Sequence, residues 1–333
     1  MSLQQLRYLL ALDDYRHFGA AARACYVAQP TLTTQIKKLE EELGVRLIDR
    51  RANPIEPTGV GARIITQARV ILDEVDGLYA LLAEETHSLA GEYVLGIIPT
   101  LAPYLLPLFV KSFTDAHPEV RLIVREMQSE QIIDGLKRKQ VDLGLLVTPL
   151  EEKQLREIVL FYEPFLIYAS PEEEILRQTP LLPDHLRRSE LWILQQGHCF
   201  RNQVLNLCKS SAAVELPTNP AAPDATAPAT SPRDSDGSRT GAFTFQAGSI
   251  ETLKNMVKNN LGYTIVPELS VDPERDAART KRFAEPQPAR EVSLVVSRTF
   301  ARERLLVELR RAILEVVPER FRKNERYVGV AWR

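Results

Sequence analysis

Strand-like and helical segments alternate along most of this chain after residue 91, and this alternation restricts the fold more than any other feature. The first series has strand-like runs at 93–98, 120–125 and 142–147, separated by helical runs at 104–116 and 129–139. A second series has strand-like runs at 165–170, 192–194, 242–245, 263–266 and 292–296, with helical runs at 249–260 and 302–317. Such alternation indicates βαβ units. We predict an α/β fold of two similar halves on mostly parallel sheets, with a ligand cleft between them.

The composition divides the chain into three regions. Residues 1–58 read as three short helices followed by a small β-hairpin, 59–88 as one long helix, and 89–333 as the α/β region. Within the last region, 210–241 consists largely of Ala, Pro, Ser, Thr and Asp. Such a segment buries too little apolar surface to offset the cost of ordering, so we expect a mobile loop there.

A short helix near the N-terminus has the polar face of a DNA-reading helix. Pro30 stands in its first turn, a favoured start, and Leu32, Ile36 and Leu39 share one face. The opposite face carries hydrogen-bonding side chains, which suit base edges in a major groove. The residues predicted at this surface are Gln29, Pro30, Thr31, Thr33, Thr34, Gln35 and Lys38.

Two short runs, 45–51 and 53–58, predict a wing of two strands after this helix. Arg50 and Arg51 fall in the wing, where arginines can contact phosphates. The alternative for 1–58 is a small helical core with a solvated polar face, because a helix-turn-helix pattern in one sequence is only a hypothesis.

The long helix carries an apolar seam at spacings of four and three residues. Thr58 is its expected N-cap. A seam of this kind can pair with a second copy of itself, which would place two reading heads on two DNA half-sites. The alternative is a helix that packs on its own domain. The seam consists of Ile64, Ala68, Ile71, Val75, Leu78 and Leu82.

Composition excludes several classes of protein. The net charge of −2 does not indicate a nucleic-acid binder, so any DNA contact depends on a local patch. Three cysteines are too few for a secreted disulfide scaffold. The sequence shows neither a signal peptide nor an apolar run long enough to span a membrane, so we expect a cytoplasmic protein with no membrane partner.

Two of the cysteines, Cys199 and Cys208, lie in the helical stretch 197–208. If that stretch is a helix, their Cα atoms are about 13 Å apart. A disulfide needs them within about 7 Å, so the pair can bond only after the helix melts. This predicts a redox switch; the alternative is that both are buried core cysteines with no redox role. Thr100, Ser129 and 197–199 all follow predicted strands, so they are expected to converge.

Several motifs then identify a family. Residues 18–23, 29–36 and 43–48 resemble the winged helix-turn-helix of LysR-type transcriptional regulators. The resemblance covers nearly the whole chain, and it implies that 89–333 is an effector domain with the fold of a periplasmic binding protein. The stretch 197–201 with Cys208, together with 98–107 and 249–257, is similar to the peroxide-sensing OxyR branch of that family.

The resemblance implies a role for individual residues. Cys199 would be the peroxide-reactive thiol and Cys208 the resolving one. Four further residues would surround the bound peroxide or tune the reactivity of Cys199: Thr100, Ser129, His198 and Arg201. Ser129 stands where the family pattern has Thr. The implied partners are double-stranded promoter DNA, RNA polymerase, thiol reductants for reset, and further copies of the chain in a homodimer or homotetramer.

The chemistry that follows requires a thiolate, so Cys199 is expected to have a lowered pKa. Three sources of positive charge stand near it in sequence: a protonated His198, Arg201, and the N-terminus of the helix that starts near Cys199. Attack on peroxide gives a sulfenic acid that condenses with Cys208. The resulting repacking would shift the spacing of the DNA-reading heads.

Two other functions fit parts of the sequence. A LysR-type regulator could respond to a small metabolite in the cleft, with the cysteines incidental. A thiol peroxidase would use the cysteines but leave residues 1–58 and the long helix without a purpose. We therefore expect a regulator and not an enzyme, with no cofactor and no metal.

Overall fold

The computed structural model describes residues 1–85, 89–186, 191–209, 229–230, 244–245, 247–259 and 262–333. The described chain forms two compact units. One comprises 1–88 with 299–303, and the other comprises 89–298 with 304–333. Most of the expected mobile loop at 210–241 lies outside the described residues. No helix within the described ranges is long and apolar enough to cross a lipid bilayer.

The first unit begins with the three predicted short helices, α1 (Leu3–Tyr15), α2 (Phe18–Ala24) and α3 (Gln29–Leu43). Ser2 starts α1 with a capping box, in which its hydroxyl accepts from Gln5 N–H. Leu9 and Leu12 of α1 are fully buried against Leu32 and Ile36 of α3. The predicted wing is a pair of two-residue antiparallel strands, β1 (Ile48–Asp49) and β2 (Glu56–Pro57).

The long helix α4 spans Gly59–Glu85. The Thr58 hydroxyl accepts a hydrogen bond from Gly61 N–H at 2.9 Å, which confirms the predicted N-cap. Arg69 of α4 is nearly buried and pairs with Asp13 and Asp14 of α1, at 2.9 and 2.7 Å. These ion pairs fix the first half of α4 to its own helical domain.

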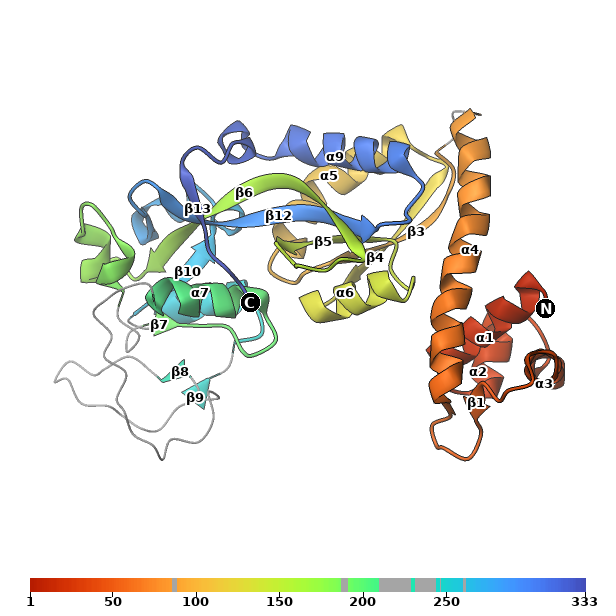
Figure 1. The fold of residues 1–333 in the computed structure, drawn as a ribbon. Helices are drawn as coiled ribbons and strands as arrows, with labels where there is room; N and C mark the ends of the chain where they lie inside the picture. Colours follow the sequence, from red (N-terminus) through yellow and green to blue (C-terminus); the bar gives the residue numbers. More distant parts are fainter. Residues whose placement is uncertain (86–88, 187–190, 210–228, 231–243, 246, 260–261) are drawn as a thin grey trace. The chain divides into compact units, whose positions relative to one another are not determined.

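The second unit is built on one mixed sheet whose main strand order is β4-β3-β5-β12-β6-β10-β7 (Figure 1). In the first half, β3 pairs in parallel with β4 and β5. In the second half, β10 pairs in parallel with β7. The strands are β3 (Gly91–Ile97), β4 (Val120–Glu126), β5 (Leu143–Thr148), β6 (Leu155–Ala169), β7 (Leu191–Trp192), β10 (Tyr263–Pro267) and β12 (Gln287–Ser297).

Two long strands correct the prediction of mostly parallel sheets. Strand β6 pairs antiparallel with β12 along 155–164 and with β10 along 165–169, so it passes from one half to the other. The chain crosses back through β12, which also pairs antiparallel with β5. Parts of both strands were predicted, at 165–170 and 292–296, but the alternation of strands and helices does not show which strands pair or in which direction.

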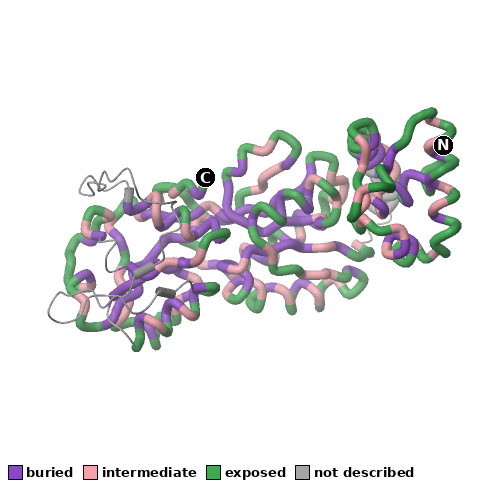
Figure 2. The backbone as a smooth tube through the Cα atoms, turned by 90° about the horizontal axis from the view of Figure 1, so that it is seen from below, coloured by how far each residue is buried: buried purple, intermediate pink, exposed green. Residues whose placement is uncertain are grey.

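Helices cover both faces of this sheet, and Figure 1 shows α5 and α9 on one side and α6 on the other. Figure 2 shows buried residues along the segments that run through the middle of this unit. The helices are α5 (Ala102–Ala116), α6 (Ser129–Lys137), α7 (Cys199–Lys209), α8 (Ile250–Asn259) and α9 (Glu303–Val316). Shorter pieces are β8 (Ala229–Thr230), β9 (Thr244–Phe245), β11 (Thr280–Arg282) and β13 (Tyr327–Gly329).

The C-terminal segment is an ordered part of the sheet. Strand β13 pairs in parallel with β12, with Gln287 opposite Tyr327. The four residues that follow, 330–333, form what we call the C-terminal strap. The Trp332 side chain of this strap is buried and donates to the carbonyl of Pro149 at 3.1 Å.

Candidate functional site

Cys199 and Cys208 both lie on α7, at its first residue and near its end. The predicted helix is confirmed, and its rise places the two Cα atoms about 13 Å apart. Both cysteines are buried, at 6% and 1% exposure, and neither forms a disulfide. This form of the protein is therefore the reduced one, in which the two thiols cannot bond without a change in α7.

Gly197 brings the chain into α7 through a conformation that other residues rarely adopt. Its φ is +99°, and a Cβ at this position would lie 2.8 Å from Nε2 of Gln128. Gln128 is the N-cap of α6, the helix that begins with Ser129. Glycine thus permits the starts of α6 and α7 to approach each other, which places Ser129 beside Cys199.

Arg290 of β12 is the central charged group of the site. Its side chain is completely buried and forms an ion pair with Glu163 of β6, with 2.8 Å between Nε and Oε2. The guanidinium also donates to Thr100 Oγ1 at 2.9 Å and to the Thr100 carbonyl at 3.0 Å. It lies 5.6 Å from the ring centroid of Phe200, the residue after Cys199. Arg290 therefore joins both halves of the sheet to the start of α7.

The environment of Cys199 acts on its thiol in two directions. Burial raises the pKa of Cys199, which corrects the expectation of a lowered value. The Ser129 hydroxyl, the charge of Arg290 and the backbone N–H groups at the start of α7 lower this pKa and limit the rise. A thiol in such a position is mostly protonated at neutral pH, and the groups that lower its pKa are placed to stabilise the thiolate as it forms.

Two hydroxyl groups, one near the thiol and one held by Arg290, could bind a small polar ligand. The Ser129 Oγ is buried, makes no hydrogen bond of normal geometry to another described residue, and lies close enough to the Cys199 thiol to lower its pKa. The Thr100 Oγ1 accepts from Arg290, so its own hydrogen is left to point elsewhere. A molecule with two oxygen atoms that both donate and accept, such as a peroxide, matches a pair of hydroxyls around a thiol.

His198 and Arg201 were both predicted to lower the pKa of Cys199 by positive charge, and the structure gives each a different role. Burial lowers the pKa of His198, so its imidazole is neutral at pH 7 and acts as a hydrogen-bonding group. Arg201 donates to the carbonyl of Leu194 at 2.7 Å, which ties α7 to the segment that leads into it. Of the groups near Cys199, Arg290 supplies the positive charge that lowers its pKa.

Sequence reasoning missed Arg290 and Glu163 because both lie just outside the strands it predicted, 292–296 and 165–170. The two residues face each other across the β6–β12 ladder. A signal was present at Glu163, a lone charge within a run of apolar and aromatic strand residues, whereas Arg290 stands beside a second charge, Glu291. Such charges are rarely buried unless they are paired.

The predicted DNA surface lies on one side of α3. Gln29, Pro30, Thr31, Thr34 and Lys38 are exposed, and Thr33 and Gln35 are half-buried. Gln35 accepts from Gln5 Nε2 at 3.3 Å, and the Thr33 hydroxyl donates to the Gln29 carbonyl. The exposed residues are therefore the ones free of the domain core and able to face a groove.

The wing arginines Arg50 and Arg51 are both exposed. Arg50 pairs with Glu40 of α3 at 2.7 Å and lies over the Phe18 ring. Glu40 in turn accepts from the N–H groups of Leu47 and Ile48. Arg50 thus helps to position the wing as well as presenting charge to solvent.

We expect Arg50→Ala to weaken DNA binding to a similar degree on all sequences and to lower the salt dependence by about one counterion, as the loss of a phosphate contact does. Fluorescence anisotropy on a specific and a scrambled duplex at several salt concentrations measures this. Glu40→Gln is the matched control, because it breaks the same ion pair and leaves Arg50 in place. A change of preference at one base pair would contradict the wing assignment.

The predicted seam of α4 divides into two parts. Ala68 is buried against Leu6 of α1, and Ile64 and Ile71 pack on the same domain. Val75 is half-buried and Leu78 is 63% exposed, while the side chain of Leu82 lies outside the described residues. The part of the seam that is available to a second copy of the chain therefore begins near Val75.

Within the described ranges, no group of three or more His, Cys, Asp or Glu side chains is placed to hold a metal ion.

A helix-turn-helix unit with a wing, a long helix and a two-half α/β unit together define a class of bacterial transcription regulators. The family model of the bacterial regulatory helix-turn-helix protein of the lysR family matches residues 3–62. The model of the LysR substrate binding domain matches 86–227 and 238–318. The chain belongs to the LysR family.

Within that family, the chain is similar to proteins of the OxyR type. It is 33% identical to the hydrogen peroxide-inducible genes activator of Haemophilus influenzae, over 89% of this chain and 90% of that protein. It is 32% identical to the dual regulator OxyR of Escherichia coli, over 89% of each. A full-length OxyR mutant from Pseudomonas aeruginosa has a TM-score of 0.74 at 28% identity, covering 95% of this chain and 99% of that one.

Proposed function

We propose that this protein is a transcription regulator that senses hydrogen peroxide through Cys199 and Cys208. In this proposal, residues 1–58 bind promoter DNA, 59–88 pair two chains, and 89–333 detect the signal. The observation that carries it is the buried Cys199 thiol at the start of α7, near Ser129 and near Arg290, which in turn binds Thr100. The similarity to peroxide-inducible gene activators over most of both chains supports the same signal.

The chemistry proceeds in two balanced steps. The Cys199 thiolate attacks one peroxide oxygen, the O–O bond breaks, and the second oxygen leaves as hydroxide, which takes a proton to become water. Cys199 is then a sulfenic acid. The Cys208 thiol displaces this hydroxyl as a second water and forms the S–S bond. Two electrons leave the thiols and reduce one peroxide. Ser129, Thr100 and neutral His198 orient the peroxide by hydrogen bonds.

Formation of the disulfide requires that α7 lose its helical form. Phe200, Val204 and Leu207 of α7 are buried in the core, and Phe200 packs edge-on against Phe165 with centroids 5.1 Å apart. Withdrawing such side chains costs about 1.5–3 kcal/mol each. The covalent bond stabilises the opened form against this cost, so oxidation and rearrangement are coupled.

The rearranged effector unit would then alter how copies of the chain assemble and how the reading heads meet DNA. The partners in this proposal are promoter DNA, RNA polymerase, and further copies of the chain in a homodimer or homotetramer. Thiol reductants reset the switch by exchange with the disulfide.

Thiol mapping by mass spectrometry, before and after one equivalent of hydrogen peroxide, tests this function. We expect a Cys199–Cys208 disulfide within seconds. Cys199→Ser should abolish both the disulfide and the peroxide-induced change in transcription from a bound promoter. The matched control is Cys25→Ser, because Cys25 lies in the helical domain and is half-buried.

Two unmodified thiols after exposure would exclude peroxide as the signal. Retention of the transcriptional response in Cys199→Ser would instead indicate a small metabolite as effector. Stable sulfenic acid on Cys199 without a disulfide would preserve peroxide sensing and remove Cys208 as the resolving thiol.

A further inference from the structure

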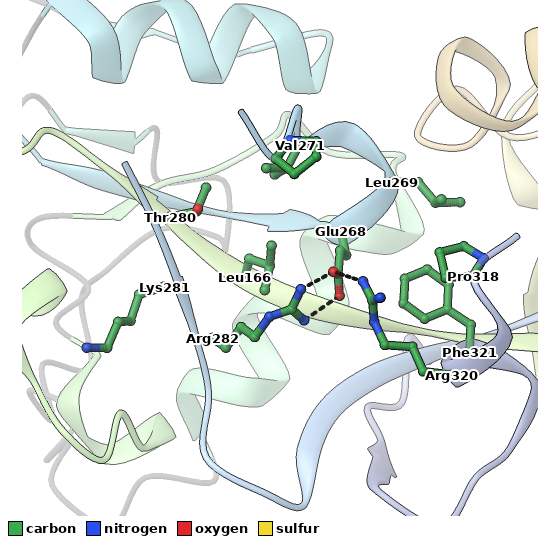
Figure 3. A pocket seen from close by; sticks show the side chains of 11 residues that line it. Leu166, Glu268, Leu269, Val271, Thr280, Lys281, Arg282, Pro318, Arg320 and Phe321 are labelled. Carbon is green, nitrogen blue, oxygen red and sulfur yellow. Dashed lines mark hydrogen bonds and ion pairs between the residues drawn. The ribbon is translucent and has the colours of Figure 1, made fainter. Parts of the chain in front are cut away.

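A pocket of about 390 Å³ opens on the second unit, and its lining includes none of the residues placed around Cys199. It lies between β6, β11 and two short 3-10 helices, η4 (Glu268–Ser270) and η6 (Glu319–Arg322) (Figure 3). Leu166, Val271 and Phe321 contribute apolar walls. The pocket is large enough for a small organic molecule.

The polar part of the lining has an excess of positive charge. Lys281, Arg282 and Arg320 all line the pocket, against a single carboxylate, Glu268. Arg282 donates to both oxygens of Glu268, and Arg320 donates to one of them (Figure 3). Glu268 is 9% exposed, whereas Arg282 and Arg320 are about half-exposed. One carboxylate thus faces two guanidinium groups, each of which has five N–H donors.

We propose that this pocket binds a small organic anion, a monocarboxylate with an apolar body. The carboxylate would pair with Arg320 and Arg282 beside Glu268, since a guanidinium matches a carboxylate in charge and shape. The apolar body would lie against Leu166, Val271 and Phe321. A purely inorganic anion would use the charges and leave these walls in water.

The pocket is linked to the cysteine site by a chain of hydrogen bonds. The N–H of Leu269, the residue after Glu268, donates to Glu163 Oε1 at 2.8 Å. The other oxygen of Glu163 accepts from Arg290, which donates to Thr100 and faces Cys199. The Lys254 ammonium holds the third residue of η4, Ser270, through its carbonyl. All three residues of η4 therefore have anchored positions.

Binding at the pocket should then slow the reaction of Cys199, an extension that rests on the proposed function. An added carboxylate competes with Glu268 for its arginines and places more negative charge on the Glu163 side of Arg290. Arg290 then supports the Cys199 thiolate less well. We expect the bound anion to slow the oxidation of Cys199 by about fivefold or more, as in a typical coupling between two sites.

Isothermal titration calorimetry of the reduced full-length protein with benzoate tests the binding. We expect saturable binding of benzoate, with benzamide and inorganic phosphate at least tenfold weaker. Arg320→Gln should weaken benzoate binding by about tenfold or more, as the loss of a charge-assisted pair does. The matched control is Arg311→Gln, because Arg311 is similarly exposed and paired to Glu308, and it does not line the pocket.

Several results would overturn the proposal. The first is an absence of saturable benzoate binding up to about 10 mM. The second is an affinity for benzamide equal to that for benzoate, and the third is a loss of benzoate affinity in Arg311→Gln equal to that in Arg320→Gln. Benzoate binding with no effect on Cys199 oxidation would overturn the link to the cysteine site. Benzoate binding is measured without peroxide, so it can be observed even if Cys199 does not react with peroxide. Conversely, if benzoate does not bind, the reaction of Cys199 with peroxide in the unliganded protein is unaffected.

Discussion

Replacing Arg290 by methionine is expected to destabilise the effector unit by about 3–5 kcal/mol, the usual result of breaking a buried ion pair from one side. The cause is Glu163, which stays completely buried and loses its charged partner. The same change removes the two hydrogen bonds to Thr100 and the positive charge that lowers the pKa of Cys199. Urea unfolding and the rate of Cys199 oxidation measure the two effects.

The destabilisation should depend on pH in a defined direction. Burial raises the pKa of Glu163 and Arg290 opposes that rise, so the variant has a still higher pKa at this carboxyl. A carboxyl whose pKa is higher in the folded than in the unfolded state adds stability at low pH. That contribution is lost as the pH rises through the folded-state pKa. The deficit relative to the native protein should therefore be smaller near about pH 5 than near about pH 8.

A matched substitution separates this effect from the general loss of an arginine. Arg311→Met removes an arginine whose side chain is 59% exposed, so it should change stability by less than about 1 kcal/mol. Glu163→Gln together with Arg290→Met leaves no buried carboxylate and should remove the pH dependence. A pH-independent deficit in the single variant would show that Glu163 is not the cause.

The short N-terminal helices could be predicted from sequence because they depend on local periodicity. Leu9, Leu12, Leu32 and Ile36 recur at helical spacing and are indeed buried together. The crossing strands were less predictable. Strand β6 is 15 residues long, and its first part pairs with β12, more than 120 residues further on. Pairing between such distant segments leaves no periodic signal within either one.

The candidate site divides in the same way between local and distant signals. Cys199, Cys208 and the helix that holds them could be found because they are neighbours in sequence. Of the three predicted sources of positive charge, the N–H groups at the start of α7 do lower the pKa of Cys199, whereas burial lowers the pKa of His198 and Arg201 binds the Leu194 carbonyl. Arg290 is 91 positions away from Cys199, and only the pairing of β12 with β6 brings it to the start of α7.

The C-terminal strap contacts the cysteine helix α7 directly (Figure 1). Three side-chain amides of α7 donate to three successive carbonyls of the strap. The pairs are Gln203 to Val330 at 2.7 Å, Asn206 to Ala331 at 2.9 Å and Asn202 to Trp332 at 3.1 Å. Arg333 also reaches the Leu150 carbonyl and pairs with Glu130 of α6. The strap therefore holds α7 in its helical form.

Deleting residues 330–333 is expected to make α7 open more readily and the Cys199–Cys208 disulfide form faster. The deletion removes three hydrogen bonds worth about 0.5–1.5 kcal/mol each. The equilibrium constant for the opening of α7 should therefore rise by about one to three factors of ten. Hydrogen exchange of the α7 amides and the rate of disulfide formation measure this.

Two further variants serve as controls. The double variant Asn202→Ala with Asn206→Ala leaves Trp332 in place and should give a smaller shift in the same direction. Val328→Ala on exposed β13 should give none. Unchanged exchange in α7 after the deletion would mean that the strap does not restrain the helix and that the core side chains, led by Phe200, set its opening alone.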